Sequence, residues 1–96
     1  MTITKNESGK TMELFIEGWV DIVSAPELAK EIDNLDPGIE NLILDFKKTE
    51  YISSVGIRQI VAAHKKMNGN LTLRNVSGEV MNVLNMSGIS KRVHIE

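Results

Sequence analysis

The chain has 96 residues, a formal net charge of −2 and no cysteine. This length fits one domain with a modest core, and it leaves little room for a deep enclosed active site as well. So small a net charge gives no electrostatic reason to expect nucleic acid as a partner, because nucleic-acid binders carry a basic stripe. The lack of cysteine excludes disulfides, zinc–thiolate sites and thiol chemistry, and it fits a reducing compartment.

The first residues, Met1–Glu7, contain neither the basic nor the apolar segment of a secretion signal. No apolar run approaches the ~20 residues that cross a bilayer. We therefore expect a single cytoplasmic domain over residues 1–96, without membrane insertion.

Two strands are predicted at the start of the chain. A short strand over residues 2–5 is followed by a turn at Gly9-Lys10 and then by an alternating segment over residues 12–19. Alternation of apolar and polar side chains predicts a half-buried strand. Phe15 and Trp19 interrupt its polar side.

A helix is predicted next, with Asp21 and Ser24 as candidate caps. Ser24 is favoured, because Pro26 and Glu27 follow it at the spacing of a capped helix start. Asp36-Pro37-Gly38 ends the helix. Its apolar side chains recur on one face: Ala25, Leu28, Ala29, Ile32 and Leu35.

The middle of the chain predicts a strand and a second helix. The nearly continuous apolar run Leu42–Phe46 is typical of a central strand that is buried on both faces. A short link then leads to a helix from about Ser54 to Met67, with Gly69 as a left-handed cap after it. The predicted apolar stripe of this helix is Ile57, Ile60, Val61, His64 and Met67.

The last part predicts a strand over residues 71–76, a helix capped by Ser77 and closed by Gly88, and a short strand over residues 92–95. The order is therefore β-β-α-β-α-β-α-β. Strand–helix–strand units require right-handed crossovers and parallel pairing, whereas the first two strands form an antiparallel hairpin. We expect a small α/β domain with a mixed sheet and with helices mainly on one face.

Residues suited to catalysis are few. Ser53 and Ser54 offer hydroxyls, but the Gly-x-Ser-x-Gly elbow is absent. His64 falls near the other end of the same predicted helix, about 15 Å from Ser54, and His94 has no paired ligand in the sequence. No phosphate-binding loop, dinucleotide fingerprint or acidic metal cluster is present. A small enzyme or nucleotide binder is the least favoured alternative, and we expect no catalytic residue, metal or cofactor.

Ser54 stands at the start of the second predicted helix. The free N–H groups and the positive dipole end of a first turn make a serine there exposed, oriented and suited to carry a phosphate. The simpler interpretation is that Ser53 or Ser54 only caps the helix. Gly56 in a first turn costs ~1 kcal/mol against alanine, so close approach of a partner's backbone or of a phosphate is one physical reason for it. Val55 and Ile57 beside it offer an apolar contact.

Several segments, in the same order and at similar spacing, resemble the anti-sigma factor antagonists of the STAS-domain family. The similarity extends over most of the chain, and the segments that carry it are Gly18-Trp-Val-Asp-Ile-Val-Ser-Ala25, Leu42-Ile-Leu-Asp45, Tyr51-Ile-Ser-Ser-Val-Gly-Ile57, Ala62-Ala-His-Lys65 and Val83-Leu-Asn-Met-Ser-Gly-Ile89.

The resemblance places the family's phosphorylated serine, two positions before the motif glycine, at Ser54. Relatives often have aspartate at the preceding position, where this chain has Ser53, so modification of Ser53 is the less favoured alternative. The family's acidic residue near the first helix matches Asp21. Relatives commonly continue into a C-terminal helix, whereas this sequence stops at Glu96, which would leave weaker packing on one side of the sheet or apolar surface for self-association.

The resemblance implies a protein that binds an anti-sigma factor, itself a serine kinase, and so frees a sigma factor. The kinase uses ATP and magnesium to phosphorylate the serine, and a metal-dependent serine phosphatase reverses the step. We expect a monomer or weak dimer. The alternative is a STAS module outside this cycle, as a signalling scaffold or a transporter-accessory subunit. The expected partner-binding residues are Asp21, Ser24, Ser53, Ser54, Val55, Gly56, Ile57 and Arg58.

Overall fold

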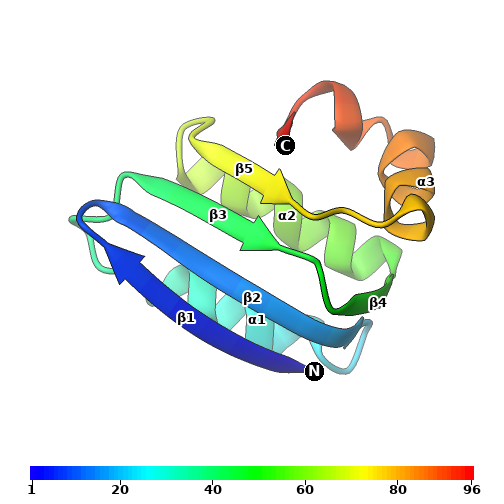
Figure 1. The fold of residues 1–96 in the computed structure, drawn as a ribbon, viewed down its shortest axis with the longest axis horizontal. Coiled ribbons are helices and arrows are strands. Elements are labelled where there is room, and N and C mark those ends of the chain that lie inside the picture. Colours follow the sequence, from blue (N-terminus) through cyan, green and yellow to red (C-terminus); the bar gives the residue numbers. More distant parts are fainter.

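The computed structural model describes residues 1–96. It forms one mixed sheet in the order β1-β2-β3-β5-β6, with β4 paired to β2 beyond β3 (Figure 1). This confirms the prediction of a small α/β domain. The elements are β1 Thr2–Ser8, β2 Thr11–Val20, α1 Ala25–Asp33, β3 Asn41–Asp45, β4 Thr49–Ile52, α2 Ser54–Lys66, β5 Leu71–Arg74, α3 Gly78–Ser87, the 3₁₀ turn η1 Ile89–Lys91 and β6 His94–Ile95.

The antiparallel part of the sheet is the hairpin of β1 and β2. Ser8 pairs with Thr11, so Gly9 and Lys10 form a two-residue turn, and the φ of Gly9 is +61°. A tight hairpin turn needs such a positive φ, which glycine adopts without steric cost. All other strand pairs are parallel, as the predicted crossovers require.

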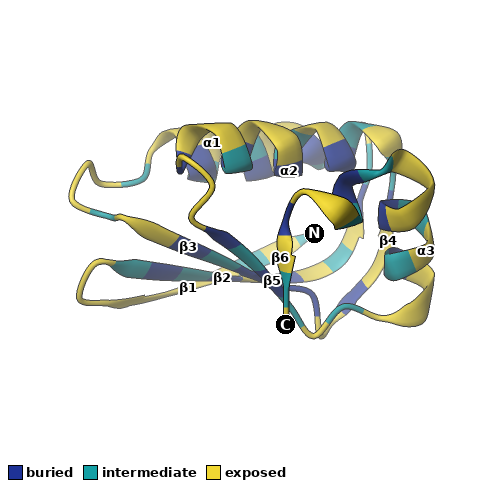
Figure 2. Ribbon diagram, turned by 90° about the horizontal axis from the view of Figure 1, so that it is seen from above, coloured by how far each residue is buried: buried dark blue, intermediate teal, exposed yellow.

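The core lies between one face of the sheet and the helices α1 and α2, while α3 packs at one end of the sheet near β4 (Figure 2). Alternate residues of β2 point into this core, which is why Met12, Leu14 and Ile16 are buried. The opposite face has no helix over it and is mostly polar, with Phe15 and Ile43 as apolar exceptions. There the Arg74 guanidinium lies 2.8 Å from Glu13 and 3.2 Å from Glu96.

Two strand predictions were wrong. The segment expected to be a short link contains β4, whose Tyr51 and Ile52 pair with Trp19 and Val20 of β2. The strand β3 was expected to be buried on both faces, but Ile43 is only half-buried because no helix covers the second face. The connection from β3 to its parallel neighbour β5 therefore runs through β4 and then α2.

The ends of α2 and α3 follow the predictions, and α2 runs from Ser54 to Lys66 with Gly69 after it at a φ of 88°. Ser77 caps α3 by accepting the N–H of Val80 at 3.2 Å, and Gly88 ends that helix at a φ of 80°. In α2 the buried stripe includes Ala63, whereas Val61, which we expected inside, is exposed. The helix therefore sits rotated from the predicted orientation.

Candidate functional site

The candidate site lies where β2 and β4 end side by side. The N–H of Ser53 donates to the carbonyl of Val20 at 2.8 Å, so the chain leaves both strands at neighbouring points. From there β2 continues into the loop before α1, and β4 continues directly into α2. Parallel strands bring their carboxyl ends to one edge of a sheet, and this explains why residues 21–24 and 53–58 belong to one surface.

The two serines at the start of α2 have different roles. Ser53 is the N-cap residue, and its hydroxyl accepts the N–H of Gly56 at 3.3 Å. Ser54 is the first residue of the helix and is exposed, and its hydroxyl makes no hydrogen bond within the chain. No acidic side chain stands in the first turn of α2. The capping duty therefore falls on Ser53, and the hydroxyl of Ser54 is free.

Packing inside the domain explains why residue 56 is a glycine, whereas we expected the approach of a partner's backbone or a phosphate to explain it. A Cβ at this position would lie 2.6 Å from Ile52 Cγ1, 2.8 Å from Val20 Cγ1 and 3.2 Å from the Val20 carbonyl oxygen. The glycine lets the first turn of α2 sit directly on the ends of β2 and β4. Gly56 is buried, and so is Ile57. Neither of these two expected contact residues presents a side chain to solvent.

The loop before α1 is fixed by Asp21 and Ser24. The Asp21 carboxylate accepts the N–H of Val23 and of Ser24, each at 3.0 Å. The hydroxyl of Ser24 donates to the Trp19 carbonyl at 2.7 Å and accepts the N–H of Asp21 at 2.9 Å. The N–H of Ser24 holds the pKa of the Asp21 carboxyl below its ordinary value.

The structure places the N-cap of α1 at Ser24, as predicted, but the hydroxyl of Ser24 does not make the expected capping hydrogen bond. Ser24 itself has helical backbone angles, with φ −91° and ψ −22°, and makes no side-chain cap bond. Its hydroxyl is directed back to Trp19, while Asp21 accepts the first free N–H groups and its carbonyl accepts the N–H of Ala25 at 2.8 Å. Asp21, the other candidate, starts the turn.

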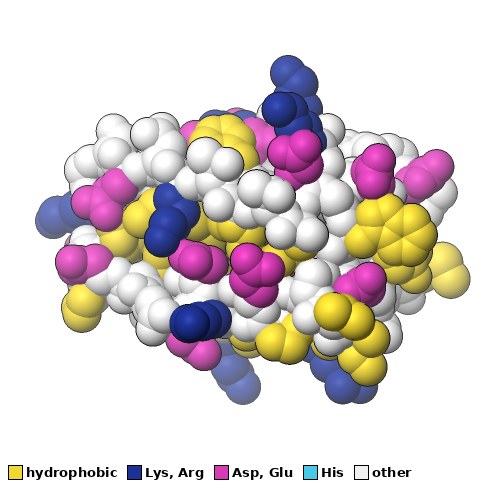
Figure 3. Space-filling view, turned by 90° about the horizontal axis from the view of Figure 1, so that it is seen from below, with side chains coloured by type: hydrophobic (Ala, Val, Ile, Leu, Met, Phe, Trp, Pro, Cys, Tyr) yellow, Lys and Arg dark blue, Asp and Glu magenta, His cyan; other side chains and the backbone are white.

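A cluster of exposed apolar side chains at this end was missed by sequence reasoning. Trp19, Ile22, Val23 and Tyr51, called the Trp19 patch below, are 56%, 73%, 83% and 43% exposed. The rings of Trp19 and Tyr51 have centroids 5.2 Å apart, and the indole N–H donates to Glu50 at 3.1 Å. Hydrophobic side chains gather at the right of Figure 3, the end at which β2 turns into α1. The only available signal was Trp19 on the polar side of its strand.

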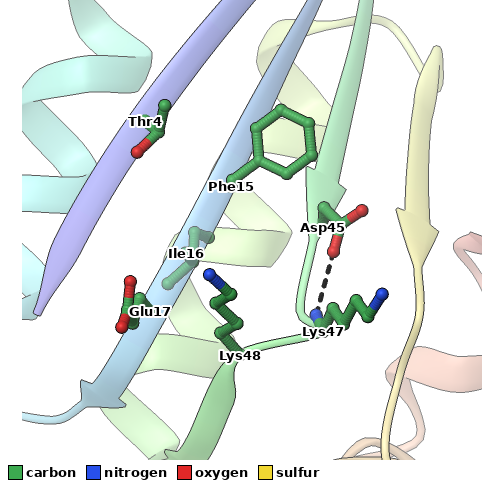
Figure 4. Close-up of a pocket in the computed structure, with 7 residues that line it drawn as sticks. All are labelled: Thr4, Phe15, Ile16, Glu17, Asp45, Lys47 and Lys48. Carbon is green, nitrogen blue, oxygen red and sulfur yellow. Dashed lines mark hydrogen bonds between the residues drawn. The ribbon is translucent and has the colours of Figure 1, made fainter.

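A separate hollow of about 240 Å³ lies on the open face of the sheet (Figure 4). The carboxylate of Asp45 accepts the N–H of Lys47 at 2.9 Å at its edge. It contains none of the predicted site residues, and its charged groups are balanced in sign. Its lining is Thr4, Phe15, Ile16, Glu17, Asp45, Lys47 and Lys48.

The remaining predicted residues are placed as follows. Val55 is half-buried and Arg58 is exposed, one turn along α2 from Ser54. His64 is half-buried near the end of α2, and His94 lies on β6, at the sheet edge opposite β1. Neither histidine forms a hydrogen bond with a serine hydroxyl, and no group of three or more acidic or histidine side chains is arranged to hold a metal. The geometry assembles an exposed surface, with no nucleophile–base pair.

The comparisons with known proteins agree with this fold. The family model of the STAS domain matches residues 2–96, and the chain belongs to this family. No curated protein matches the sequence. None of the helices has the length and hydrophobicity that crossing a bilayer would require.

Three solved structures illustrate the range of similar proteins. An anti-sigma factor antagonist from Mycobacterium paratuberculosis has a TM-score of 0.88 at 18% identity, over 98% of this chain and 83% of that one. The Bacillus cell fate determinant SpoIIAA in its phosphorylated form has a TM-score of 0.77 at 15% sequence identity, over 99% of this chain and 91% of that one. A sulfate transporter family protein from Wolinella succinogenes has a TM-score of 0.73 at 19% identity, over 88% of this chain and 76% of that one. At these identities the likeness concerns the fold.

Proposed function

We propose that this protein is an anti-sigma factor antagonist. It binds an anti-sigma factor that is also a serine kinase, which frees a sigma factor, and phosphorylation of Ser54 ends the binding. The observation that carries this proposal is that the two serines at the start of α2 have different roles. The hydroxyl of Ser53 caps the helix by accepting the N–H of Gly56, while the hydroxyl of Ser54 is exposed and makes no hydrogen bond, so a kinase can reach it.

A phosphate at the position of Ser54 is expected to weaken binding of the partner without disturbing the fold. A phosphate adds about −1.5 to −2 charges, which the positive end of α2 tolerates. The first turn contains no carboxylate that would repel it. A kinase must bring the phosphates of ATP to this hydroxyl, so a serine phosphate would face negative charge and extra bulk in the docked complex. Like-charge contacts at an interface cost several kcal/mol, and about 2.7 kcal/mol weakens affinity a hundredfold.

The proposed phosphorylation cycle needs two partners, the anti-sigma factor serine kinase and a metal-dependent serine phosphatase. The ATP and the metal ions bind to these partners and not to this chain. This chain acts in the cytoplasm as a single domain over residues 1–96, without cofactor or catalysis. The proposed contact surface centres on Ser54, with Asp21, Ser24, Ser53, Val55 and Arg58 around it and with Gly56 and Ile57 as its internal support. Similarity in fold to phosphorylated SpoIIAA supports this assignment.

The proposal is tested by mass spectrometry of the protein isolated from its own cells. The intact mass should show one phosphate that phosphatase treatment removes, and fragmentation should place it on Ser54. The phosphate should be lost in Ser54→Ala and kept in Ser53→Ala. A phosphate on Ser53 alone, or none under any growth condition, would contradict the proposal.

A second candidate function has one observation in its favour, the similarity to the sulfate transporter family protein. In that case the chain would be a transporter-accessory module outside the phosphorylation cycle. Affinity purification separates the two candidates. The proposed function requires a serine kinase, with its sigma factor released, whereas the alternative requires a membrane transporter subunit.

A further inference from the structure

A groove of about 150 Å³ lies between α2 and η1, and we call it the α2–η1 groove. Its lining is Val61, His64, Lys65, Ile89 and Arg92. Ile89 is buried, whereas the side chain of Val61 is 38% exposed. The turn on one side of the groove is ordered, since the N–H of Arg92 donates to the Ile89 carbonyl at 2.9 Å. A space of about 150 Å³ in a protein can hold benzene, so the groove has room for one aliphatic side chain.

The rim of the groove is cationic. Lys65 and Arg92 line it and are exposed, and Lys91 beside Arg92 is exposed as well. None of these three cations takes part in the salt bridges of the chain. The next lysine of α2 is engaged elsewhere, because Lys66 donates to the Asp33 carbonyl at 3.1 Å. The charges at the rim are therefore not neutralised by ion pairs within the chain.

No carboxylate interrupts this rim. Residues 51–95, from which the whole lining comes, contain six lysines and arginines and a single acidic residue, Glu79. Glu79 stands in the first turn of α3, about 12 Å along the helix from the last turn, which leads into η1. Glu96, beyond β6, is paired with Arg74 on the open face of the sheet. The groove is thus a positively charged region on a chain whose net charge is negative.

We propose that the α2–η1 groove binds a segment of another protein in which one aliphatic side chain is flanked by aspartate or glutamate. The aliphatic side chain would cover Val61 and Ile89, and the flanking carboxylates would meet Lys65 and Arg92. Charge complementarity of this kind selects an acidic segment over a basic one. This site is separate from the proposed contact surface at Ser54, and it adds a second partner contact to the proposed function.

Other occupants match the groove less well. A two-fold contact between two copies of the chain would set the same cations against each other. The acidic helix α1 of a second copy could not supply the aliphatic side chain, because its Leu28 and Ile32 are buried in its own core. Single-stranded nucleic acid is bound with aromatic side chains that stack on the bases, and residues 52–96 contain no phenylalanine, tyrosine or tryptophan.

The inference is tested by NMR titration of the full, ¹⁵N-labelled chain with a capped peptide, Glu-Glu-Leu-Glu-Glu, at up to about 5 mM. The amide signals that shift should be those of the groove lining and its neighbours. A peptide with alanine in place of leucine should bind at least about fivefold more weakly, and one with lysine in place of glutamate should not bind. No saturable shift at the groove, or an equal response to the alanine peptide, would overturn the inference.

Two substitutions with matched controls separate the groove from the rest of α2 and from net charge. Val61→Ser and Lys65→Glu should each weaken binding of the leucine peptide at least about fivefold. Ala62→Ser, an exposed neighbour outside the lining, and Lys30→Glu, an equal charge change on α1, should each stay within about twofold of wild type. Equal losses in the variants and their controls would contradict the assigned site.

Zero-length carbodiimide crosslinking of the chain purified from its own cells then identifies the natural occupant. This reagent joins an amine to a carboxylate in contact with it, so Lys65 should become linked to an aspartate or glutamate of another protein. The linked peptide should contain an aliphatic residue next to that acid. Lys30, exposed on α1, is the control and should not give the link. Links from both lysines alike, a link only to a second copy, or none from Lys65 would refute the proposed partner.

The groove and the Ser54 site can fail separately. Ser54 and Lys65 are about 16 Å apart along α2, so Ser54→Asp should bind the leucine peptide as wild type does. A chain that binds this peptide at the groove but is never phosphorylated on Ser54 would refute the proposed function alone. A chain that is phosphorylated on Ser54 but does not bind the peptide would refute the groove alone.

Discussion

The starts of α2 and α3 are built on the same capping chemistry and differ in what they expose. Ser53 and Ser77 both have extended backbone angles, and each accepts the N–H of the third residue after it, at 3.3 Å and 3.2 Å. In α2 the next residue is Ser54, with a free hydroxyl, whereas in α3 it is Gly78. The first turn of α3 also contains Glu79, whereas that of α2 has no acid.

The glycines of the two starts differ as well. A Cβ on Gly56 would overlap Ile52 and Val20, whereas a Cβ on Gly78 would meet nothing within 4 Å. A capped helix start is therefore not in itself a functional site. The start of α2 becomes a candidate site because the cap leaves one hydroxyl unused, the first turn is locked onto the strand ends, and apolar side chains stand nearby.

The largest expected effect is the loss of stability on substituting Gly56, with Gly78 as the matched control. Gly56→Val adds three carbons where the first already overlaps its neighbours, so we expect a loss of about 3 kcal/mol in the free energy of unfolding. Gly78→Val should stay within about 0.5 kcal/mol of wild type. Urea unfolding of both variants gives the difference, and equal midpoints would show that α2 is not locked as described.

Next is the effect of charge on binding. Ser54→Asp should weaken binding of the kinase about a hundredfold, because it places a negative charge at the proposed contact. Ser77→Asp is the matched control, since aspartate caps a helix as well as serine does and adds the same charge at the start of α3. Calorimetry should show wild-type affinity for the control. A loss of affinity in both variants would indicate an effect of net charge rather than of position.

Removing a capping hydroxyl should cost more stability than removing the free hydroxyl of Ser54. Ser53→Ala and Ser77→Ala should each cost about 1 kcal/mol, the usual value of a lost cap bond. Ser54→Ala should cost little, because its hydroxyl has no partner, and it should bind the kinase constitutively. Chemical unfolding of the three variants checks this order. A cost at Ser54 equal to that at Ser53 would mean that the capping roles are shared.

The smallest expected effect concerns the loop next to the α2 start. The pKa of Asp21 is lowered in the folded chain, chiefly by the N–H of Ser24, so its stabilising contribution is complete above the ordinary value of about 3.9 and is lost as the pH falls through the lower folded value. The stability gap between wild type and Asp21→Ala should therefore be constant near neutral pH and should narrow in acid. Unfolding curves between about pH 2 and pH 7 measure it. If the stability difference between wild type and Asp21→Ala instead grew in acid, the pKa of Asp21 would be raised in the folded chain, contrary to the assigned direction.

Much of the fold was predictable because its elements carry strong periodic patterns. The apolar alternation of β2 and the caps and periodicity of α3 indicated their structure directly. The strand β4 did not, because it has four residues and forms only by pairing with residues 18–20 of β2, about thirty positions away. Local sequence does not encode a pairing of that range.

The candidate site divides in the same way. The position of Ser54 was readable from local helix-start signals, and the structure places its side chain outside at the start of α2. The internal role of Gly56 was not readable, because it depends on Val20 and Ile52 of two other elements. The Trp19 patch was missed for a related reason, since Ile22 and Val23 stand in the loop that Asp21 fixes, and their residue types alone do not indicate exposed side chains.

The central claim is that negative charge on the Ser54 hydroxyl blocks docking and leaves the fold intact. It is tested most directly by installing phosphoserine at position 54 and measuring both affinity for the kinase, by calorimetry, and the urea unfolding midpoint. We expect affinity to fall at least about a hundredfold while the midpoint stays close to that of the unmodified protein. Unchanged affinity, or a loss of affinity that comes with unfolding of the domain, would contradict the account.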